Sequence, residues 1–221
     1  MKKRTIGLLG TSANPLHMGH AAIAKSSLAQ MQSLDEVWFV ITPLSPHKDK
    51  CTYEPIEHRL HLANLTARET GLLGDSLKVS EFEVHLHRFQ IENSTVVMLE
   101  HFVDAYRDLQ PVWLMGADNL AELHTWGDRW SEIMEKYPVA VFARKGFEEN
   151  VLSSEAGKKF AHARKEVGEF ECRPGTWCFI EAVEHPASST DVRRLCAQGI
   201  KSEHISNSAF KYIRKYGLYV G

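Results

Sequence analysis

Two histidines three residues apart, His17 and His20, mark the stretch of this sequence that is best suited to chemistry. A short apolar run before them, Ile6-Gly7-Leu8-Leu9, predicts a buried strand, and the run from Ala21 to Gln32 predicts a helix. The start of such a helix presents free N–H groups and a positive dipole end, which favour a bound phosphate. Two imidazole side chains beside it could hold phosphate oxygens without forming a covalent bond to them.

Two glycines and two polar residues complete this turn. We expect Gly10 to let the chain turn sharply after the strand, and Gly19 to let another molecule approach the backbone. Ser12 and Asn14 would add hydrogen-bond donors. A capped turn that binds no ligand is the alternative interpretation, whereas a zinc site would need a third ligand that the sequence does not place.

Polar segments also follow later apolar runs. Two prolines force an extended loop that ends at Lys48, and Asp118 and Arg144 follow two further predicted strands. Ser188-Ser189-Thr190 is typical of a helix N-cap, and Arg193 would lie one turn into that helix. The alternatives are a solvated Lys48, an Asp118 that only caps a helix, and an Arg193 that pairs with an acid such as Asp191.

The composition is that of an ordinary globular protein of one domain. The chain has 221 residues, 43% of them hydrophobic, and a formal net charge of −2, which argues against broad binding to nucleic acid or to anionic membranes. No apolar run approaches the roughly 20 residues of a membrane span. The four cysteines lack a zinc spacing, and we interpret them as reduced thiols of a cytoplasmic protein.

Strands and helices are predicted in alternation, which indicates an α/β fold with a doubly wound parallel sheet in a single domain, 1–221. In such a sheet ligands bind beyond the carboxyl ends of the strands, where the polar segments lie. We expect 147–175 to be a surface insertion and 77–86 to be a half-buried strand, because Phe82, Val84 and Leu86 alternate with polar residues.

Four motifs in order resemble the bacterial nicotinate-nucleotide adenylyltransferases, a family of the nucleotidylyltransferase superfamily with the H-x-G-H signature. They are listed here in chain order: Pro15-Leu16-His17-Met18-Gly19-His20, Thr42-Pro43-Leu44-Ser45-Pro46-His47-Lys48, Gly116-Ala117-Asp118 followed by Trp126, and Ser188-Ser189-Thr190-Asp191-Val192-Arg193. The resemblance spans nearly the whole chain, and it implies a Rossmann-like nucleotidylyltransferase fold.

The resemblance implies that ATP and nicotinate mononucleotide react to give nicotinate adenine dinucleotide and pyrophosphate, a step of NAD biosynthesis, with Mg²⁺ bridging ATP oxygens. It assigns catalysis to two histidines and two cations, listed as His17, His20, Lys48 and Arg193. It assigns ATP to the phosphate-facing positions Gly10, Thr11, Ser12, His17, His20, Ser189, Thr190 and Arg193. It assigns the mononucleotide to Asn14, Thr95, Asp118, Trp126 and Arg144, with no metal ligand from the protein.

The chain departs from the family at three positions. Thr11 replaces a second glycine, Ala13 replaces a phenylalanine, and Ser94 stands where the family has the tyrosine of a Tyr-Thr pair. The choice between nicotinate and nicotinamide mononucleotide therefore stays open. Two other functions are considered: an adenylyl- or cytidylyltransferase acting on another phosphate acceptor, and a diverged nucleotide-binding protein without turnover. The sequence also leaves a homo-oligomeric state open.

Overall fold

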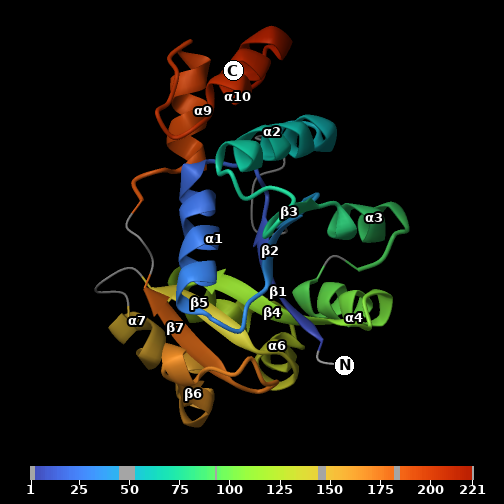
Figure 1. Cartoon of the computed structure of the whole chain (residues 1–221), viewed down its shortest axis with the longest axis vertical. Coiled ribbons are helices and arrows are strands. Elements are labelled where there is room, and N and C mark those ends of the chain that lie inside the picture. The colour runs from blue at the N-terminus through green and yellow to red at the C-terminus, as the bar shows by residue number, and fades with distance from the viewer. Residues whose placement is uncertain (1–2, 45–52, 93, 144–147, 182–184, 221) are drawn as a thin grey trace.

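A parallel sheet forms the centre of the protein in a computed structural model, which describes residues 3–44, 53–92, 94–143, 148–181 and 185–220 (Figure 1). Within these ranges the sheet has seven strands. They are β1 (Arg4–Thr11), β2 (Glu36–Ile41), β3 (Leu77–Ser80), β4 (Leu109–Gly116), β5 (Val139–Ala143), β6 (Arg164–Lys165) and β7 (Trp177–Glu181). Every pair of neighbouring strands is parallel, which confirms the predicted fold class.

The strand order changes direction between β1 and β4, because the sheet runs β3-β2-β1-β4-β5-β7-β6. Leu9 of β1 pairs with Leu114 of β4, so Thr11 and Gly116 end neighbouring strands at the same edge of the sheet. A crevice outside the carboxyl ends of strands at such a point is where open α/β sheets bind ligands. The fold therefore predicts that the functional site lies beyond Thr11 and Gly116.

Helices connect the strands and cover both faces of the sheet (Figure 1). The α-helices are α1 (Met18–Gln30), α2 (Ile56–Glu69), α3 (Phe82–Arg88), α4 (Thr95–Ala105), α5 (Ala117–Ala121), α6 (Trp130–Lys136), α7 (Glu148–Ser153), α8 (Glu155–Lys159), α9 (Ser189–Ala197) and α10 (Asn207–Tyr216). The same described ranges contain the short 3₁₀ turns η2 (Leu123–Thr125), η3 (Ala161–Ala163) and η4 (Val167–Glu169).

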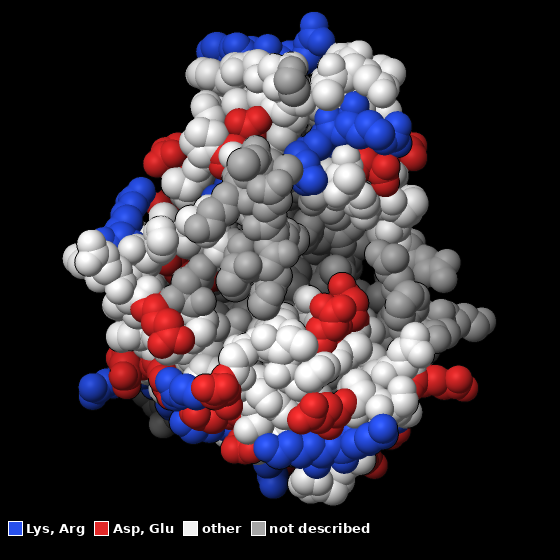
Figure 2. All heavy atoms as spheres, turned by 180° about the vertical axis from the view of Figure 1, so that it is seen from behind, with Lys and Arg blue, Asp and Glu red and all other residues white. Residues whose placement is uncertain are grey.

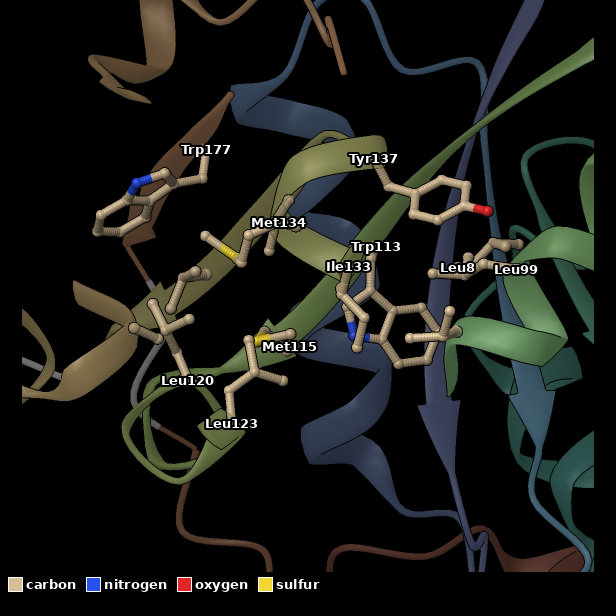
Figure 3. Close-up of a cluster of buried hydrophobic side chains, with 14 of the residues drawn as sticks. Leu8, Leu99, Trp113, Met115, Leu120, Leu123, Ile133, Met134, Tyr137 and Trp177 are labelled. Atoms are coloured by element: carbon tan, nitrogen blue, oxygen red, sulfur yellow. The ribbon is translucent and has the colours of Figure 1, made fainter. Parts of the chain in front are cut away.

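The strands are apolar on both sides because each face of the sheet carries a core. Leu8 and Trp113 point to the core shared with α4 and α6, whereas Leu9 and Leu114 point to the core shared with α1 and α2. Figure 3 shows Trp113 of β4 in the first of these cores, among side chains of β1, α4 and α6. A Cβ on Gly10 would lie 2.6 Å from the Trp113 ring, so this glycine lets an indole pack closely against β1.

A third apolar cluster joins α2, α9 and α10 at the carboxyl edge of the sheet. It contains Leu62 of α2, Val192 of α9 and Ile213 of α10, all fully or almost fully buried. The final helix begins at its cap Ser206, which accepts a hydrogen bond from the Ala209 N–H, and ends at Gly217, which has the left-handed backbone typical of a helix end. The cluster places the start of α9 over the loop that follows β1.

The prediction of a strand over 77–86 is partly wrong. Only Leu77–Ser80 is a strand, and Phe82–Arg88 is helix α3. Phe82 and Leu86 are four residues apart, so in a helix they share one face, and both pack against the core of α4 and α6. The same apolar spacing therefore fits a short helix as well as a strand.

Residues 148–175 contain α7, α8 and β6, and β6 extends the sheet beside β7. Val151, Ala156 and Phe160 of this segment are buried in the core that the sheet shares with α4 and α6. The prediction that 147–175 is an insertion relative to the rest of the fold stays a prediction.

Across the described ranges, no helix combines the length and apolar character that crossing a membrane requires. Figure 2 shows basic side chains gathered at the top of the reverse face and acidic and basic side chains mixed along its lower edge.

Candidate active site

The two histidines of the H-x-G-H stretch form the cap of α1. His17 is the N-cap residue, and its Nδ1 accepts a hydrogen bond from the Gly19 N–H at 3.2 Å. His20 Nδ1 accepts from the His17 N–H at 3.3 Å, so the two residues cap the helix reciprocally. Each neutral ring then carries its proton on Nε2 because its Nδ1 is an acceptor. The capped turn and the anion site are thus compatible, since the cap uses Nδ1 and leaves Nε2 as a donor.

The loop between β1 and α1 brings the two rings close together. Their centroids are 4.1 Å apart. The sharp turn falls at Ala13, which has a φ of 46°, and the Asn14–Pro15 peptide bond is cis. The expectation that Gly10 makes the turn is therefore wrong, because Gly10 lies within β1.

Gly19 lies where protein groups pack closely, and its expected role toward a ligand stays a prediction. A Cβ at this position would lie 3.0 Å from the His17 ring and 3.4 Å from Ala187 Cβ. A side chain at this position would therefore push the His17 ring aside by a few tenths of an ångström. The glycine lets the His17 ring lie against the first turn of α1.

Burial and neighbouring rings keep His17 neutral. The residue is 7% exposed, and burial is the main cause that lowers its pKa from 6.5 to about 2. Three further imidazoles, those of His20, His185 and His204, lower the His17 pKa in the same direction. Anionic oxygens of a ligand would reverse the effect of these rings, because they favour the protonated form.

His185 and His204 were not predicted from the sequence. Their rings lie edge to face with centroids 5.2 Å apart, and the His204 carbonyl accepts a hydrogen bond from the Met18 N–H at 2.8 Å. Burial, followed by the neighbouring His204, lowers the His185 pKa. Only its place in the sequence could have indicated that His185 belongs to the site, because it lies between the last long strand and the Ser188 cap.

We expect His17 to make the protein less stable in acid. The unfolded chain binds a proton near the ordinary pKa of 6.5, whereas the folded chain binds it only near 2, so the free energy of unfolding falls as the pH drops below about 6.5. The loss from this residue should be about 2 kcal/mol between about pH 7 and about pH 5. Urea unfolding at both pH values, with wild type and His17→Asn, measures it.

Asparagine keeps an acceptor for the helix cap but does not titrate, so His17→Asn should show a smaller loss of stability in acid than wild type. The exposed His162, replaced in the same way, serves as the control and should keep the wild-type pH dependence. Equal pH dependence in wild type and His17→Asn would contradict the assigned burial effect.

The start of α9 is bonded directly to the loop of the two histidines. Ser189 Oγ donates to the Pro15 carbonyl at 3.1 Å, and Arg193 Nη1 donates to the Asn14 carbonyl at 2.9 Å. Arg193 Nη2 lies 3.3 Å from Thr190 Oγ1. The acid Asp191 pairs with Arg194 at 3.0 Å, so the alternative in which Arg193 pairs with Asp191 is not observed.

Asp118 and Trp126 follow β4, the strand next to β1. Asp118 is exposed in the first turn of α5, and a Cβ on Gly116 would lie 2.3 Å from its Oδ1. Trp126 is half-buried and packs on the edge of the core of α4 and α6. This ring is therefore partly a core residue and partly exposed.

The start of α4 lies beside a small recess. Ser94 caps the helix by accepting a hydrogen bond from the Val97 N–H at 3.4 Å, and Thr95 is half-buried in the first turn. Glu83 Oε2 accepts from Thr42 Oγ1 at 3.1 Å, and burial raises the Glu83 pKa to about 7. The recess is lined by Glu83, Leu86, His87, Ile91, Glu92, Ser94 and Met98.

A buried arginine of α2, which was not predicted from the sequence, holds together the loops that follow β1 and β2. Arg59 is 2% exposed and donates to the carbonyl oxygens of Ser12 at 2.6 Å, Thr42 at 2.9 Å and Pro43 at 2.5 Å. Its Nε donates to the Glu54 carbonyl at 2.9 Å. The guanidinium therefore fixes the chain where it leaves β1 and β2. No local sequence pattern indicates this role, because its partners are backbone atoms.

The structure thus joins the Thr11–His20 loop to α9 by direct bonds and places Asp118 at the end of the adjacent strand. Lys48 and Arg144 lie outside the described residues. Within the described ranges, no group of three or more His, Cys, Asp or Glu side chains could hold a metal ion.

Comparison with known proteins gives three results that agree. A model of the family described as Cytidylyltransferase-like matches residues 8–195. A protein of Mesorhizobium japonicum named "Probable nicotinate-nucleotide adenylyltransferase" is 34% identical over 199 residues, covering 88% of this chain and 96% of its own length. A protein of the same name from Brucella abortus is 33% identical over 196 residues, covering 86% and 95%.

Among solved structures, the nicotinic acid mononucleotide adenylyltransferase of Plasmodium falciparum complexed with NaAD superposes with a TM-score of 0.69 at 15% identity, covering 98% of this chain and 97% of the other. The same enzyme complexed with APC gives a TM-score of 0.67. At this identity the similarity establishes the fold.

Proposed function

The chain belongs to the nicotinate-nucleotide adenylyltransferases of the cytidylyltransferase-like family, and from this premise we propose that it adenylates nicotinate mononucleotide in NAD biosynthesis. ATP would be the donor, and the products would be nicotinate adenine dinucleotide and pyrophosphate. The observation that carries the proposal is the reciprocal His17–His20 cap at the carboxyl edge of the sheet, with α9 bonded to the same loop.

The reaction needs alignment and charge stabilisation. An oxygen of the mononucleotide 5′-phosphate forms a bond to the α-phosphorus of ATP while the bond between that phosphorus and the bridging oxygen to the β-phosphorus breaks. Pyrophosphate leaves with the electron pair of the broken bond. The attacking phosphate is already an anion, so the protein needs no nucleophile of its own and must hold two repelling groups in line.

The ATP phosphates would lie at the start of α1, facing the two Nε2–H groups of His17 and His20. The backbone of Gly10, Thr11 and Ser12 leads into this site. Ser189, Thr190 and Arg193 would hold the departing β- and γ-phosphates, and Arg193 is already beside the loop through its bond to the Asn14 carbonyl. Donors fixed before the reaction stabilise developing charge without reorganising.

The mononucleotide would bind on the side of β4 and α4. Asp118 and Asn14 would contact its polar groups, the half-buried Trp126 ring would pack on the pyridine, and Thr95 would lie near the carboxylate. Lys48 and Arg144, which are outside the described residues, would supply further positive charge.

Mg²⁺ would come with ATP, held by phosphate oxygens and water. The donor set supports this, because the residues around the loop are hydrogen-bond donors and the described ranges hold no cluster of metal ligands. When bound, the ion neutralises phosphate charge.

The absence of nucleic acid and the location are also part of the proposal. The formal charge of −2 supports a protein that does not bind nucleic acid, and a cytoplasmic location is supported by Cys172, Cys178 and Cys196, which are buried and form no disulfide among the described residues. We expect no membrane association, and a homo-oligomer is compatible with these observations.

Pyrophosphate release with ATP and a panel of acceptors tests the function. We expect turnover with nicotinate mononucleotide, and the ratio to nicotinamide mononucleotide measures the effect of Ser94 at the start of α4. Turnover only with another acceptor, such as phosphopantetheine, would replace the proposed substrate. ATP binding without release of pyrophosphate from any acceptor would mean that the protein is not an enzyme of this class.

A further inference from the structure

Thr11 is the last residue of β1, and its hydroxyl contacts two residues of the loop that leads to α1. Thr11 Oγ1 is 3.0 Å from His20 Nε2, and it accepts a hydrogen bond from the Ala13 N–H at 3.1 Å. The residue is 9% exposed. The hydroxyl therefore links the buried strand to the ring of His20.

The direction of the Thr11–His20 bond follows from the cap of α1. His20 Nδ1 accepts from the His17 N–H, so the proton of the neutral ring is on Nε2. The bond must then run from His20 Nε2–H to Thr11 Oγ1. Both nitrogens of His20 are held by neighbouring groups, which fixes the tautomer and the direction of its N–H.

Thr11 Oγ1 can accept both bonds because a hydroxyl oxygen has two lone pairs. Its own hydrogen has no acceptor among the described residues. A phosphate oxygen entering between Thr11 and His20 could therefore receive hydrogen bonds from the hydroxyl and from the imidazole.

We propose that Thr11 is a positioning residue that holds His20 as an Nε2–H donor and passes this N–H to the nucleotide phosphate when ATP binds. A charged phosphate oxygen is a stronger acceptor than a neutral hydroxyl, so the exchange is favourable. The inference rests on the proposed function. It also gives a chemical role to a side chain that stands where glycine is expected from the family pattern.

Thr11→Val removes the oxygen but keeps the branched shape that suits a strand. We expect kcat to fall about tenfold, the size of one lost hydrogen bond in the transition state, with a smaller change in the KM for ATP. Thr11→Ser keeps the oxygen and should stay within about threefold of wild type. Thr5→Val, a buried threonine at the other end of β1, is the matched control and should leave kcat unchanged.

The His20 ring can be observed without activity. With ¹⁵N-labelled histidine, NMR spectra of the side chains should show His20 of wild type and of Thr11→Ser protonated at Nε2. The Thr11→Val ring should give a shifted or tautomer-averaged signal. These spectra remain informative if the substrate is a different phosphate acceptor, so failure of the proposed function and failure of the role of Thr11 can be told apart.

Three outcomes would overturn the proposal: a wild-type His20 protonated at Nδ1, a Thr11→Val kcat equal to wild type, or equal losses in Thr11→Ser and Thr11→Val. If the valine variant does not fold, Thr11→Ala replaces it in both measurements. The Ala13 N–H loses the same acceptor in both variants, so unfolding in urea separates loss of stability from loss of kcat.

Discussion

His20→Ala should lower kcat for adenylyl transfer by about 100-fold or more, the effect of removing one donor to a developing negative charge. His20 sits at the start of α1 with its Nδ1 held by the His17 N–H and its Nε2–H aimed at Thr11, so this donor is in place before the phosphates arrive. Steady-state kinetics of pyrophosphate release, with ATP and mononucleotide both saturating, measure the loss.

His20 is also part of the helix cap, and the two roles can be separated. Asparagine in place of His20 retains an acceptor near the Nδ1 position but has no group at Nε2. We expect His20→Asn to restore much of any stability lost in His20→Ala without restoring kcat. The exposed His162→Ala variant should behave like wild type in both assays. A folded His20→Ala protein with unchanged kcat would remove His20 from the mechanism.

Arg59→Met should be the most destabilising single change in the site, with a loss of about 3–5 kcal/mol in the free energy of unfolding. The methionine fills much of the same volume but leaves the carbonyl oxygens of Ser12, Thr42, Pro43 and Glu54 without the donor that now serves them. Urea unfolding followed by circular dichroism gives the midpoint and the slope from which the loss is obtained.

Arg68 of the same helix is the matched control, because its side chain is exposed. Arg68→Met should change the free energy of unfolding by less than about 0.5 kcal/mol. If the free energies of unfolding of Arg59→Met and Arg68→Met agreed within about 1 kcal/mol, the four hydrogen bonds from Arg59 to carbonyl oxygens would contribute little to stability.

The sequence was sufficient to predict the strands whose residues are buried on both faces. Glu36–Ile41 and Val139–Ala143 are short runs of almost entirely apolar residues, which is the pattern of a strand buried on both faces. The segment with Phe82 and Leu86 was mispredicted because apolar residues four apart satisfy a two-residue repeat and also lie on one face of a helix.

The site was predictable where one short motif contains both the donor and the element that positions it. His17 and His20 are such a case, because a strand, a turn and a helix start lie within the same stretch. Arg59, His185 and His204 could not be predicted in this way, since their partners are backbone atoms or rings far away in the chain. Ala13 makes the turn that was expected at Gly10, and only the structure shows that Gly10 leaves room for the Trp113 ring and Gly19 for the His17 ring.

The bonds from Ser189 and Arg193 to the Pro15 and Asn14 carbonyls span 174 and 179 residues of sequence, and the Met18 N–H is bonded to the His204 carbonyl. Contacts between residues so far apart in the sequence close a long stretch of chain, which costs conformational entropy before the bonds can stabilise the structure. We therefore expect the histidine loop to reach its native position late in folding, after α9 and the segment of His204 have packed against it.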